Sequence, residues 1–377
     1  MRVRKGRIGV MLFALVGTSA LLGFEGASAQ LVVEDFVFTG AAAEEGYQGN
    51  LPTASVTAVD STEYAAAAVG EFGARGNVAI HSGASHEVML RMDGGVRQFA
   101  AAGFELRDYA PREWVGSAEL EYERRISDWG FVTARGLLRG RDVHDRPPMP
   151  LFIQPAFWAG EAGVGVETRS LRGTIFDAQV TREGARYQAP SFAPNLLLLD
   201  RDVLEVEVGA SRSVAAGSTV RVYAGWEGSE YPRQSTFDPS DPFRRDNTVR
   251  GGLMWARPAE VYSQLGVEVA ANRSNSRRPE YDAFSIRGLV SKPVWGELDL
   301  TVSALLTGKR YVHPTEFARL IPGEEADNAS VVYASLSRPL APNLDGTLRA
   351  GWTRAETDIG EHYYQRLGLT FLMNYRP

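Results

Sequence analysis

Hydrophobic and polar residues alternate over long stretches of this chain. In the closing segment YYQRLGLTFLMNYRP, one set of alternate positions holds Tyr363, Gln365, Leu367, Leu369, Phe371, Met373 and Tyr375. The other set is mostly polar and holds Tyr364, Arg366, Gly368, Thr370, Leu372, Asn374 and Arg376. A period of two residues predicts a β-strand with one apolar face.

The same alternation recurs upstream, for example in GELDLTVSALLTG, NLDGTLRAGWTRA, STVRVYAGWEG and WVGSAELEYERRI. It predicts about sixteen strands, within a range of fourteen to eighteen, each long enough to cross a bilayer as a tilted strand. The predicted strands lie near residues 34–46, 63–73, 85–98, 114–126, 129–142, 159–169, 171–184, 200–213, 217–230, 245–256, 260–272, 280–291, 296–310, 327–338, 343–356 and 363–376.

The connections between these strands alternate in length. Short ones include SDWG, RSLRG and SVAAG, and long ones include RDVHDRPPMPLFIQPAFWAG and KRYVHPTEFARLIPGEEAD. An even strand number with alternating short turns and long loops is typical of an outer-membrane barrel. A secreted soluble sandwich or lipocalin-like barrel also alternates apolar and polar residues, but it gives no reason for alternating loop lengths. We therefore expect an all-β fold, a transmembrane antiparallel up-and-down β-barrel whose apolar face meets lipid.

The N-terminus has the features of a secretory signal peptide. Arg2, Arg4, Lys5 and Arg7 precede an apolar run from Ile8 to about Leu22, and an Ala-Ser-Ala site ends at Ala29. A membrane-anchoring helix is the alternative, but the run is shorter than the ~20 residues that such a helix needs. We expect export, cleavage near Ala29, and a single barrel domain over residues 30–377.

Composition narrows the class of protein further. The chain has no cysteine, a formal charge of -6 and 44% hydrophobic residues. It therefore has neither disulfides nor cysteine-ligated metals, and no basic block indicates a nucleic-acid partner. Predicted strands with only alternate residues facing lipid agree with this moderate hydrophobicity.

These features together resemble bacterial outer-membrane β-barrels of the porin-like class. The signal peptide, the repeated hairpins and the final amphipathic strand with Phe371 and Tyr375 carry the resemblance, which covers the whole mature chain. Members of that class usually end on an aromatic residue, whereas Arg376 and Pro377 follow Tyr375 here. The resemblance implies the architecture, outer-membrane lipid and lipopolysaccharide as surroundings, and assembly by dedicated machinery.

If the apolar positions face outward, the alternate charged positions line the lumen. Candidate pore-lining residues for solute selectivity are Glu87, Arg91, Arg97, Glu119, Glu121, Glu123, Arg135, Arg139, Glu205, Glu207 and Arg349. A column of glutamates between two arginine-bearing strands can orient or filter charged solutes. The same residues can instead form cross-strand ion pairs that only close the wall, and the sequence does not separate the two interpretations.

Sixteen strands leave an aqueous passage unless a loop folds inward. The segment from about Val143 to Ala159 is the candidate constriction loop, because it is rich in proline and carries Phe152, Phe157 and Trp158. The alternative is an outward loop packed on its neighbours.

Catalysis is not expected. His144 lies between Asp142 and Asp145, an arrangement that also occurs in solvated loops. No Gly-x-Ser-x-Gly or His-Glu-x-x-His motif is present. Asp238 and Asp241 in FDPSDPF lack a full ligand set for a cation, and Asp-Pro turns explain them better. We expect neither a cofactor nor a metal.

The function expected from the sequence is passive diffusion of small polar or charged solutes through a porin-like pore. One alternative is a structural or surface-binding barrel whose lumen is closed by ion pairs. Another is the outer-membrane component of polymer or exopolysaccharide export. The identity of the solute and the oligomeric state do not follow from the sequence.

Overall fold

A computed structural model describes residues 32–49, 65–102, 112–126, 128–144, 156–168, 171–189, 194–214, 217–236, 238–276, 280–313, 330–356 and 363–377. Residues 1–29, the predicted signal peptide, lie outside these ranges, so export and cleavage near Ala29 stay predictions. Within the described ranges, no helix has the length and apolar character needed to cross a membrane.

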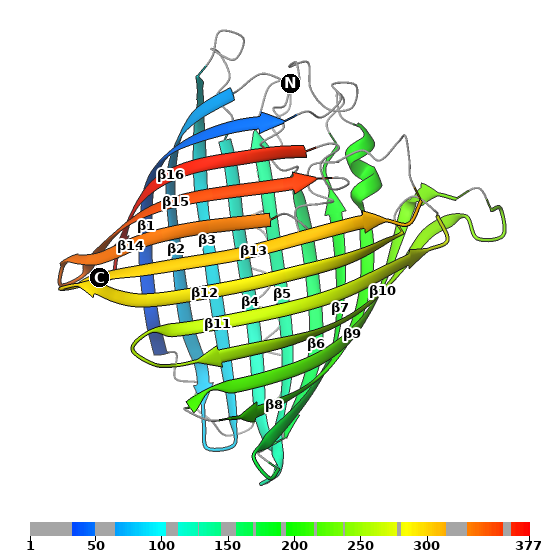
Figure 1. Cartoon of the computed structure of the whole chain (residues 1–377), viewed down its shortest axis with the longest axis horizontal. Helices are drawn as coiled ribbons and strands as arrows, with labels where there is room; N and C mark the ends of the chain where they lie inside the picture. The colour runs from blue at the N-terminus through cyan, green and yellow to red at the C-terminus, as the bar shows by residue number, and fades with distance from the viewer. Residues whose placement is uncertain are drawn as a thin grey trace.

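Sixteen antiparallel strands form one closed barrel, and each strand pairs with its neighbours in sequence (Figure 1). The strands are β1 (Val32–Gly49), β2 (Ala65–Ser82), β3 (His86–Ala102), β4 (Arg112–Ile126), β5 (Gly130–His144), β6 (Phe157–Thr168), β7 (Thr174–Tyr187), β8 (Arg201–Ser213), β9 (Thr219–Ser235), β10 (Phe243–Arg257), β11 (Tyr262–Ser274), β12 (Tyr281–Trp295), β13 (Leu298–Tyr311), β14 (Ser330–Ala341), β15 (Leu344–Glu356) and β16 (Tyr363–Tyr375). The predicted fold class and strand number are confirmed.

The barrel closes between its first and last strands. β1 pairs with β16 from Phe38 opposite Tyr375 to Gly49 opposite Tyr364. Closing the sheet leaves no strand edge, so every strand in the wall has backbone partners on both sides.

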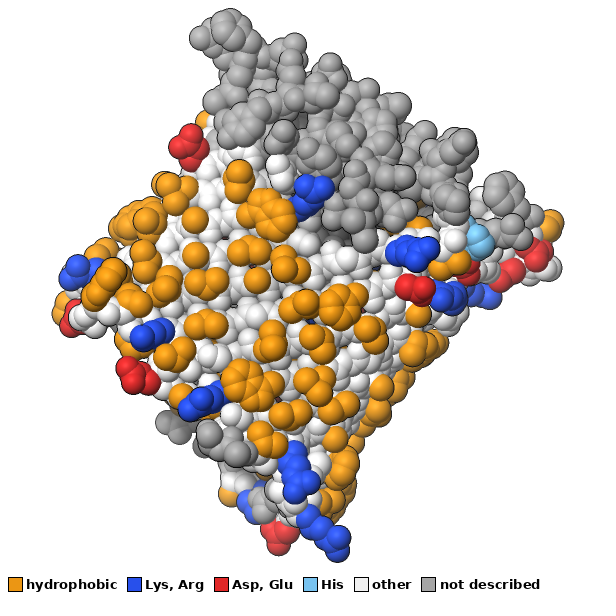
Figure 2. All heavy atoms as spheres, in the orientation of Figure 1, with side chains coloured by type: hydrophobic (Ala, Val, Ile, Leu, Met, Phe, Trp, Pro, Cys, Tyr) orange, Lys and Arg blue, Asp and Glu red, His pale blue; other side chains and the backbone are white. Residues whose placement is uncertain are grey.

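The outer face of the wall is apolar. Val249 and Val269 are each 59% exposed and Leu367 is 55% exposed, although all three lie on strands. Figure 2 shows hydrophobic side chains spread across the visible face between the two ends of the barrel. Such side chains on a closed barrel face lipid rather than a protein core, so the barrel is transmembrane.

The two ends of the barrel differ. At one end, which we call the short-turn end, brief connections join the strands, such as residues 296–297 between β12 and β13. Gly296 adopts a positive φ of 56° in this turn, a conformation that glycine tolerates without strain. The C-terminus lies at the same end, where the Arg376 amide donates to the Asn343 carbonyl at 2.9 Å. The other end is the long-loop end.

Longer connections, such as those from β5 to β6 and from β7 to β8, join strands at the long-loop end. One of them contains the 3-10 helix η2 (Pro194–Leu199). Leu199 in this helix is 2% exposed and packs against Tyr187 and Ala189. Asp200 follows η2 and is held by Arg233 at 2.7 Å, so this connection is fixed to β9.

Most strand positions agree with the alternation, but the second strand is an exception. The sequence predicts it near residues 63–73, whereas β2 runs from Ala65 to Ser82. Alternation continues through Gly76, Asn77 and Val78 and breaks only near the end of the strand, where the register shifts between Ala79 and His81. A bulge of this kind moves the following side chains to the opposite face, and a strict period of two cannot anticipate it.

Candidate functional site

The inner face of β3 to β11 carries charged side chains linked from strand to strand. Several of them remain open to water in the lumen: the side chains of Arg91, Arg135 and Arg139 are 47%, 46% and 43% exposed. At the height of these residues the described inner wall therefore presents solvent-accessible charged side chains, as expected for a barrel of this strand number.

A first ion-pair network joins β3, β4, β5 and β6. Arg91 lies 2.6 Å from both Glu119 and Glu121, which are alternate inward residues of β4. Arg135 on β5 lies 3.2 Å from Glu119 and 3.7 Å from Glu161 of β6. The glutamates stand between arginines of the flanking strands, so positive and negative charges alternate around this part of the wall.

A second network continues around the wall. Arg221 of β9 lies 2.7 Å from Asp177 and 2.9 Å from Glu207. Arg250 of β10 pairs with Glu205 and lies 3.0 Å from Glu207. Glu207 is 8% exposed and is held by two arginines from different strands. A smaller separate group joins β5, β7 and β8: Glu183 of β7 pairs with Arg139 and lies 3.3 Å from Arg201.

A third network lies beside the closing strands, toward the long-loop end. Arg97 of β3 lies 3.1 Å from Glu45, 3.2 Å from Glu71 and 3.4 Å from Glu113, on β1, β2 and β4. Arg366 of β16 lies 3.9 Å from Glu45. Glu45 and Glu113 are buried, so this network fastens five consecutive strands across the closure.

Some inward carboxylates lie apart from these networks. Glu87 stands opposite Glu123 in the register of β3 and β4, near the short-turn end. Neither glutamate forms an ion pair with another described residue. These two like charges on neighbouring strands therefore add negative potential at that end of the lumen.

The wall opposite the charged networks is hydroxylic. Figure 1 shows β12 to β16 crossing in front of β3 to β7, on the other side of the barrel. Inward serine and threonine side chains of β12 to β15 bond across strands: Ser285 to Thr307 at 3.1 Å, Ser291 to Thr301 at 2.9 Å and Ser337 to Thr347 at 2.9 Å. A solute in the lumen thus meets ion-pair networks on one side and, on the other, hydroxyl groups interspersed with cations such as Arg287 and Arg349.

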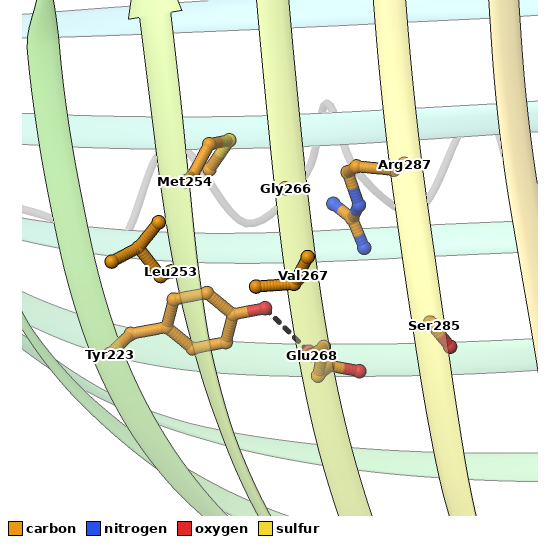
Figure 3. A pocket seen from close by; sticks show the side chains of 8 residues that line it. All are labelled: Tyr223, Leu253, Met254, Gly266, Val267, Glu268, Ser285 and Arg287. Carbon is orange, nitrogen blue, oxygen red and sulfur yellow. Dashed lines mark hydrogen bonds between the residues drawn. The ribbon is translucent and has the colours of Figure 1, made fainter.

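A small pocket marks the boundary between the charged and hydroxylic walls (Figure 3). The Tyr223 hydroxyl donates to Glu268 at 2.6 Å, and Arg287 points into the same space. The Tyr223 ring lies against Gly252, where an added Cβ would come within 2.5 Å of the Tyr223 hydroxyl oxygen. Glycine at residue 252 therefore lets the ring lie flat against the wall, leaving the pocket shallow.

The structure places every predicted pore-lining residue on the inner side of the wall. The register with neighbouring strands puts them on the polar face: Glu87, Arg91, Arg97, Glu119, Glu121, Glu123, Arg135, Arg139, Glu205, Glu207 and Arg349. Arg349 stands apart from the ion-pair networks and lies over the Tyr333 ring at 5.3 Å. Whether these residues set solute selectivity stays a prediction.

The constriction prediction does not hold for all its residues. Phe157 and Trp158 begin β6 rather than lying in a loop, and Trp158 faces outward with 49% exposure. The prediction is therefore wrong for Trp158, because the alternation of β6 sends its side chain toward lipid. Phe157 faces inward and contacts the Tyr187 ring at a centroid distance of 5.6 Å. Phe152 lies outside the described residues.

Several members of the networks were missed by sequence reasoning. These are Glu45, Glu71, Glu113, Glu161, Asp177, Glu183 and Arg201. Glu161 alternates with the apolar positions Trp158, Ala162 and Val164 of β6, so strand alternation alone could have placed it inward. Glu183 lies between Arg182 and Gly184, where the alternation is weaker. Their partners depend on register, which the alternation does not give.

No group of three or more histidine or carboxylate side chains among the described residues is arranged to hold a metal ion. Asp238 in the connection between β9 and β10 is instead part of a turn. Its Oδ1 accepts hydrogen bonds from the Ser240 hydroxyl at 2.7 Å and from the Ser240 amide at 2.8 Å. Those two bonds stabilise the carboxylate and lower the pKa of Asp238 below its ordinary value.

Comparison with known proteins gives likeness of shape alone. No protein-family model matches the chain, and no curated protein sequence matches it. Among solved structures, a BenF-like porin from Pseudomonas fluorescens Pf-5 has a TM-score of 0.45 and 10% identity, covering 92% of this chain and 100% of that one.

Pseudomonas aeruginosa OpdQ has a TM-score of 0.44 and 7% identity, covering 91% of this chain and 97% of that one. A bacterial polysaccharide outer membrane secretin has a TM-score of 0.41 and 9% identity, covering 90% of this chain and 98% of that one. Likenesses at this level carry no argument about solute or partner. The strand order and the apolar outer face of the barrel itself show that the chain has the fold of a porin-like outer-membrane β-barrel.

Proposed function

We propose that this protein is an outer-membrane channel through which small polar or charged solutes diffuse passively. The observation that carries the proposal is the exposure of charged side chains on the inner wall, where Arg91, Arg135 and Arg139 keep between 43% and 47% of their side-chain surface accessible. Charged side chains that face water inside a lipid-embedded barrel line a polar path. No covalent step is involved.

The asymmetry of the lumen supports a preference for dipolar solutes. The charged networks of β3 to β11 present alternating charges, whereas the opposite wall offers hydroxyl groups such as Thr301 and Ser337. A solute with both charged and neutral polar groups can turn its charged group toward the networks and its hydroxyl or amide groups toward β12 to β15. Ion pairs that are already satisfied bind such a solute weakly, which favours passage over retention.

The proposal includes the location of the protein. Residues 1–29 act as the signal peptide, and the barrel inserts into the outer membrane with lipid and lipopolysaccharide around its apolar face. The basis is the basic and apolar pattern of the N-terminus together with the lipid-facing belt of the barrel.

A barrel held closed by its ion pairs is the second candidate, and the extent of the networks favours it. Arg97, Glu45 and Glu113 tie neighbouring strands together through partly or fully buried groups, which is what a purely structural role requires. In that case the lumen conducts no ions, and the protein acts through its long-loop end.

Planar-bilayer recording of the refolded mature chain separates these candidates. We expect steady single-channel conductance, with a reversal potential that moves toward anion preference when Glu119, Glu121 and Glu123 are all replaced by Gln. A matched control replaces the outward residues Asp202, Glu230 and Asp282 by Asn, Gln and Asn, which removes the same charge from the lipid side of the wall. Absence of conductance in protein shown to be folded and inserted would overturn the channel and leave the closed barrel.

A further inference from the structure

The outer face of the barrel carries a ring of cations at one end. Arg124, Arg212, Arg257, Lys292 and Arg338 lie on β4, β8, β10, β12 and β14, each within a few residues of the short-turn end. We call these five residues the basic rim. Figure 2 shows Lys and Arg side chains at intervals along the edge where these strands turn.

Register places the basic rim outside the lumen. Arg124 stands opposite Val132, Arg212 opposite Val220 and Lys292 opposite Leu300, all on the apolar face of the neighbouring strand. Arg257 lies two residues after the outward Trp255 and so points to the same face of β10. Arg338 lies two residues from both Leu336 and Leu340 on the outward face of β14. Each cation is thus surrounded by lipid-facing side chains.

The five side chains of the basic rim are exposed to the surroundings of the barrel. None of them forms an ion pair or a side-chain hydrogen bond with another described residue. The strands of the barrel place no acidic residue on the outward face at this end, within the described ranges. Nothing in this part of the protein offsets the charge of the basic rim on the lipid side.

The opposite rim is different, although it also carries outward arginines. Arg186 lies 2.8 Å from Asp202, and Arg273 lies 2.8 Å from Asp282. Arg245 lies 3.4 Å from Glu230. Three of the five outward arginines that we assign to the long-loop end therefore have protein carboxylates as partners, whereas none of the basic rim does among the described residues.

We propose that the basic rim binds the phosphate headgroups of anionic phospholipids in the leaflet at the short-turn end. An arginine or lysine at the edge of an apolar belt extends its aliphatic stem along lipid and places its charge at headgroup level. Trp295, which is 81% exposed at this end, and Trp129, which is 50% exposed, suit the same interfacial depth.

The acidic residues at the short-turn end lie apart from the outward strand positions that carry the basic rim. Asp128, Glu260 and Glu297 lie in the short turns beyond the strand ends rather than on the outward face of a strand. Asp128 is also engaged by Arg125 at 3.2 Å. The arrangement places positive charge at the lipid surface and negative charge outside it.

The test measures lipid selectivity directly. The folded protein is reconstituted in phosphatidylcholine vesicles, and spin-labelled phosphatidylglycerol is compared with spin-labelled phosphatidylcholine for association with the barrel surface at about 0.1 M salt. We expect a preference of roughly fivefold for phosphatidylglycerol at the occupied positions. Replacement of all five basic-rim residues by Gln should reduce this preference to near unity.

The matched control replaces five outward arginines of the long-loop rim by Gln: Arg182, Arg186, Arg245, Arg273 and Arg310. It should keep the phosphatidylglycerol preference, because the two rims are farther apart than the screening length at this salt concentration. An equal preference in the basic-rim variant and the unmodified protein would overturn the proposal. So would equal losses in both variants, which would indicate an effect of overall charge.

A second measurement needs no variant. Raising the salt to about 0.5 M should abolish most of the preference of the unmodified protein, because exposed charges are strongly screened. A preference that survives this salt would contradict a rim of exposed cations. The readout does not depend on conductance, so failure here leaves the proposed channel untouched, and a non-conducting barrel leaves this inference intact.

Discussion

Arg97 of β3 and Glu45 of β1 form an ion pair of 3.1 Å across the intervening strand β2. The two residues are far apart in the chain, and the pair lies next to the closure of the barrel. Arg97 also lies 3.4 Å from Glu113, so one guanidinium group serves two buried carboxylates.

Loss of this guanidinium should weaken the barrel. We expect Arg97→Met to lower the free energy of unfolding by roughly 3–5 kcal/mol, because it leaves Glu45 and Glu113 buried without their shared cation. Urea unfolding in detergent micelles, followed by tryptophan fluorescence, measures the change. Arg75→Met is the control, since Arg75 is exposed and forms no ion pair with a described residue. Equal stability of the two variants would contradict a role for this network in holding the barrel closed.

Opposite members of one ion pair should act oppositely on selectivity. Arg91→Gln removes positive charge from the lumen and should move the reversal potential toward cation preference, whereas Glu121→Gln should move it toward anion preference. Bilayer recordings under a salt gradient measure both shifts. Glu230→Gln on the outer face serves as the control and should leave the reversal potential unchanged. Shifts of the same sign for Arg91→Gln and Glu121→Gln would indicate a change of pore shape rather than of charge.

A charged side chain introduced on the lipid-facing surface in the middle of a strand should lower the stability of the folded barrel. Val249 is 59% exposed on the outer face of β10, so Val249→Arg should destabilise the folded barrel by about 2–4 kcal/mol. Ser303→Arg, which introduces the same side chain toward the lumen, should cost less than about 0.5 kcal/mol. Reversible unfolding in lipid bilayers compares the two. A larger loss for the lumen variant would reverse the assignment of the two faces.

The hydrogen bonds that Ser240 donates to Asp238 should be detectable as a lowered pKa of the Asp238 carboxyl group. Because the folded pKa of Asp238 is depressed, its contribution to the turn is present above the pKa of the unfolded chain and is lost as pH falls through the lower, folded value. Ser240→Ala removes the hydroxyl donor and should raise the pKa of Asp238 toward its ordinary value. The carboxyl ¹³C shift against pH measures it. An unchanged titration would show that the Ser240 hydroxyl does not contact Asp238 in solution.

The alternation of the sequence predicted the wall of the barrel because lipid on one side and water on the other impose a period of two on nearly every strand. Leu367, Leu369 and Phe371 all face outward, as that period requires. Prediction was weaker where the period of two breaks, as in β2 near Ala79. It was also weaker at the start of β6, where Trp158 is predicted in the preceding loop but lies in the strand.

The inner face was predictable residue by residue but not pair by pair. Alternation places Arg91 and Glu121 inward, yet only the register of β3 against β4 brings them within 2.6 Å. Long side chains also reach past the residue directly opposite: Arg97 contacts Glu45 two strands away. Such contacts depend on barrel curvature and on the direction of each side chain, which hydrophobic patterning does not encode.

The pairing of β1 with β16 determines when the barrel can be completed. Thr39 donates a hydrogen bond of 2.9 Å to Asn374 across a separation of 335 residues, whereas every other strand pairs with its immediate neighbours in the chain. Hairpins can therefore form while the chain is still being delivered, but β1 and β15 keep unpaired edges until the last strand arrives. Without β16 the sheet stays open, and the unpaired backbone of β1 and β15 can pair with other chains. Pairing of β16 with both strands therefore removes the last exposed edges of the sheet.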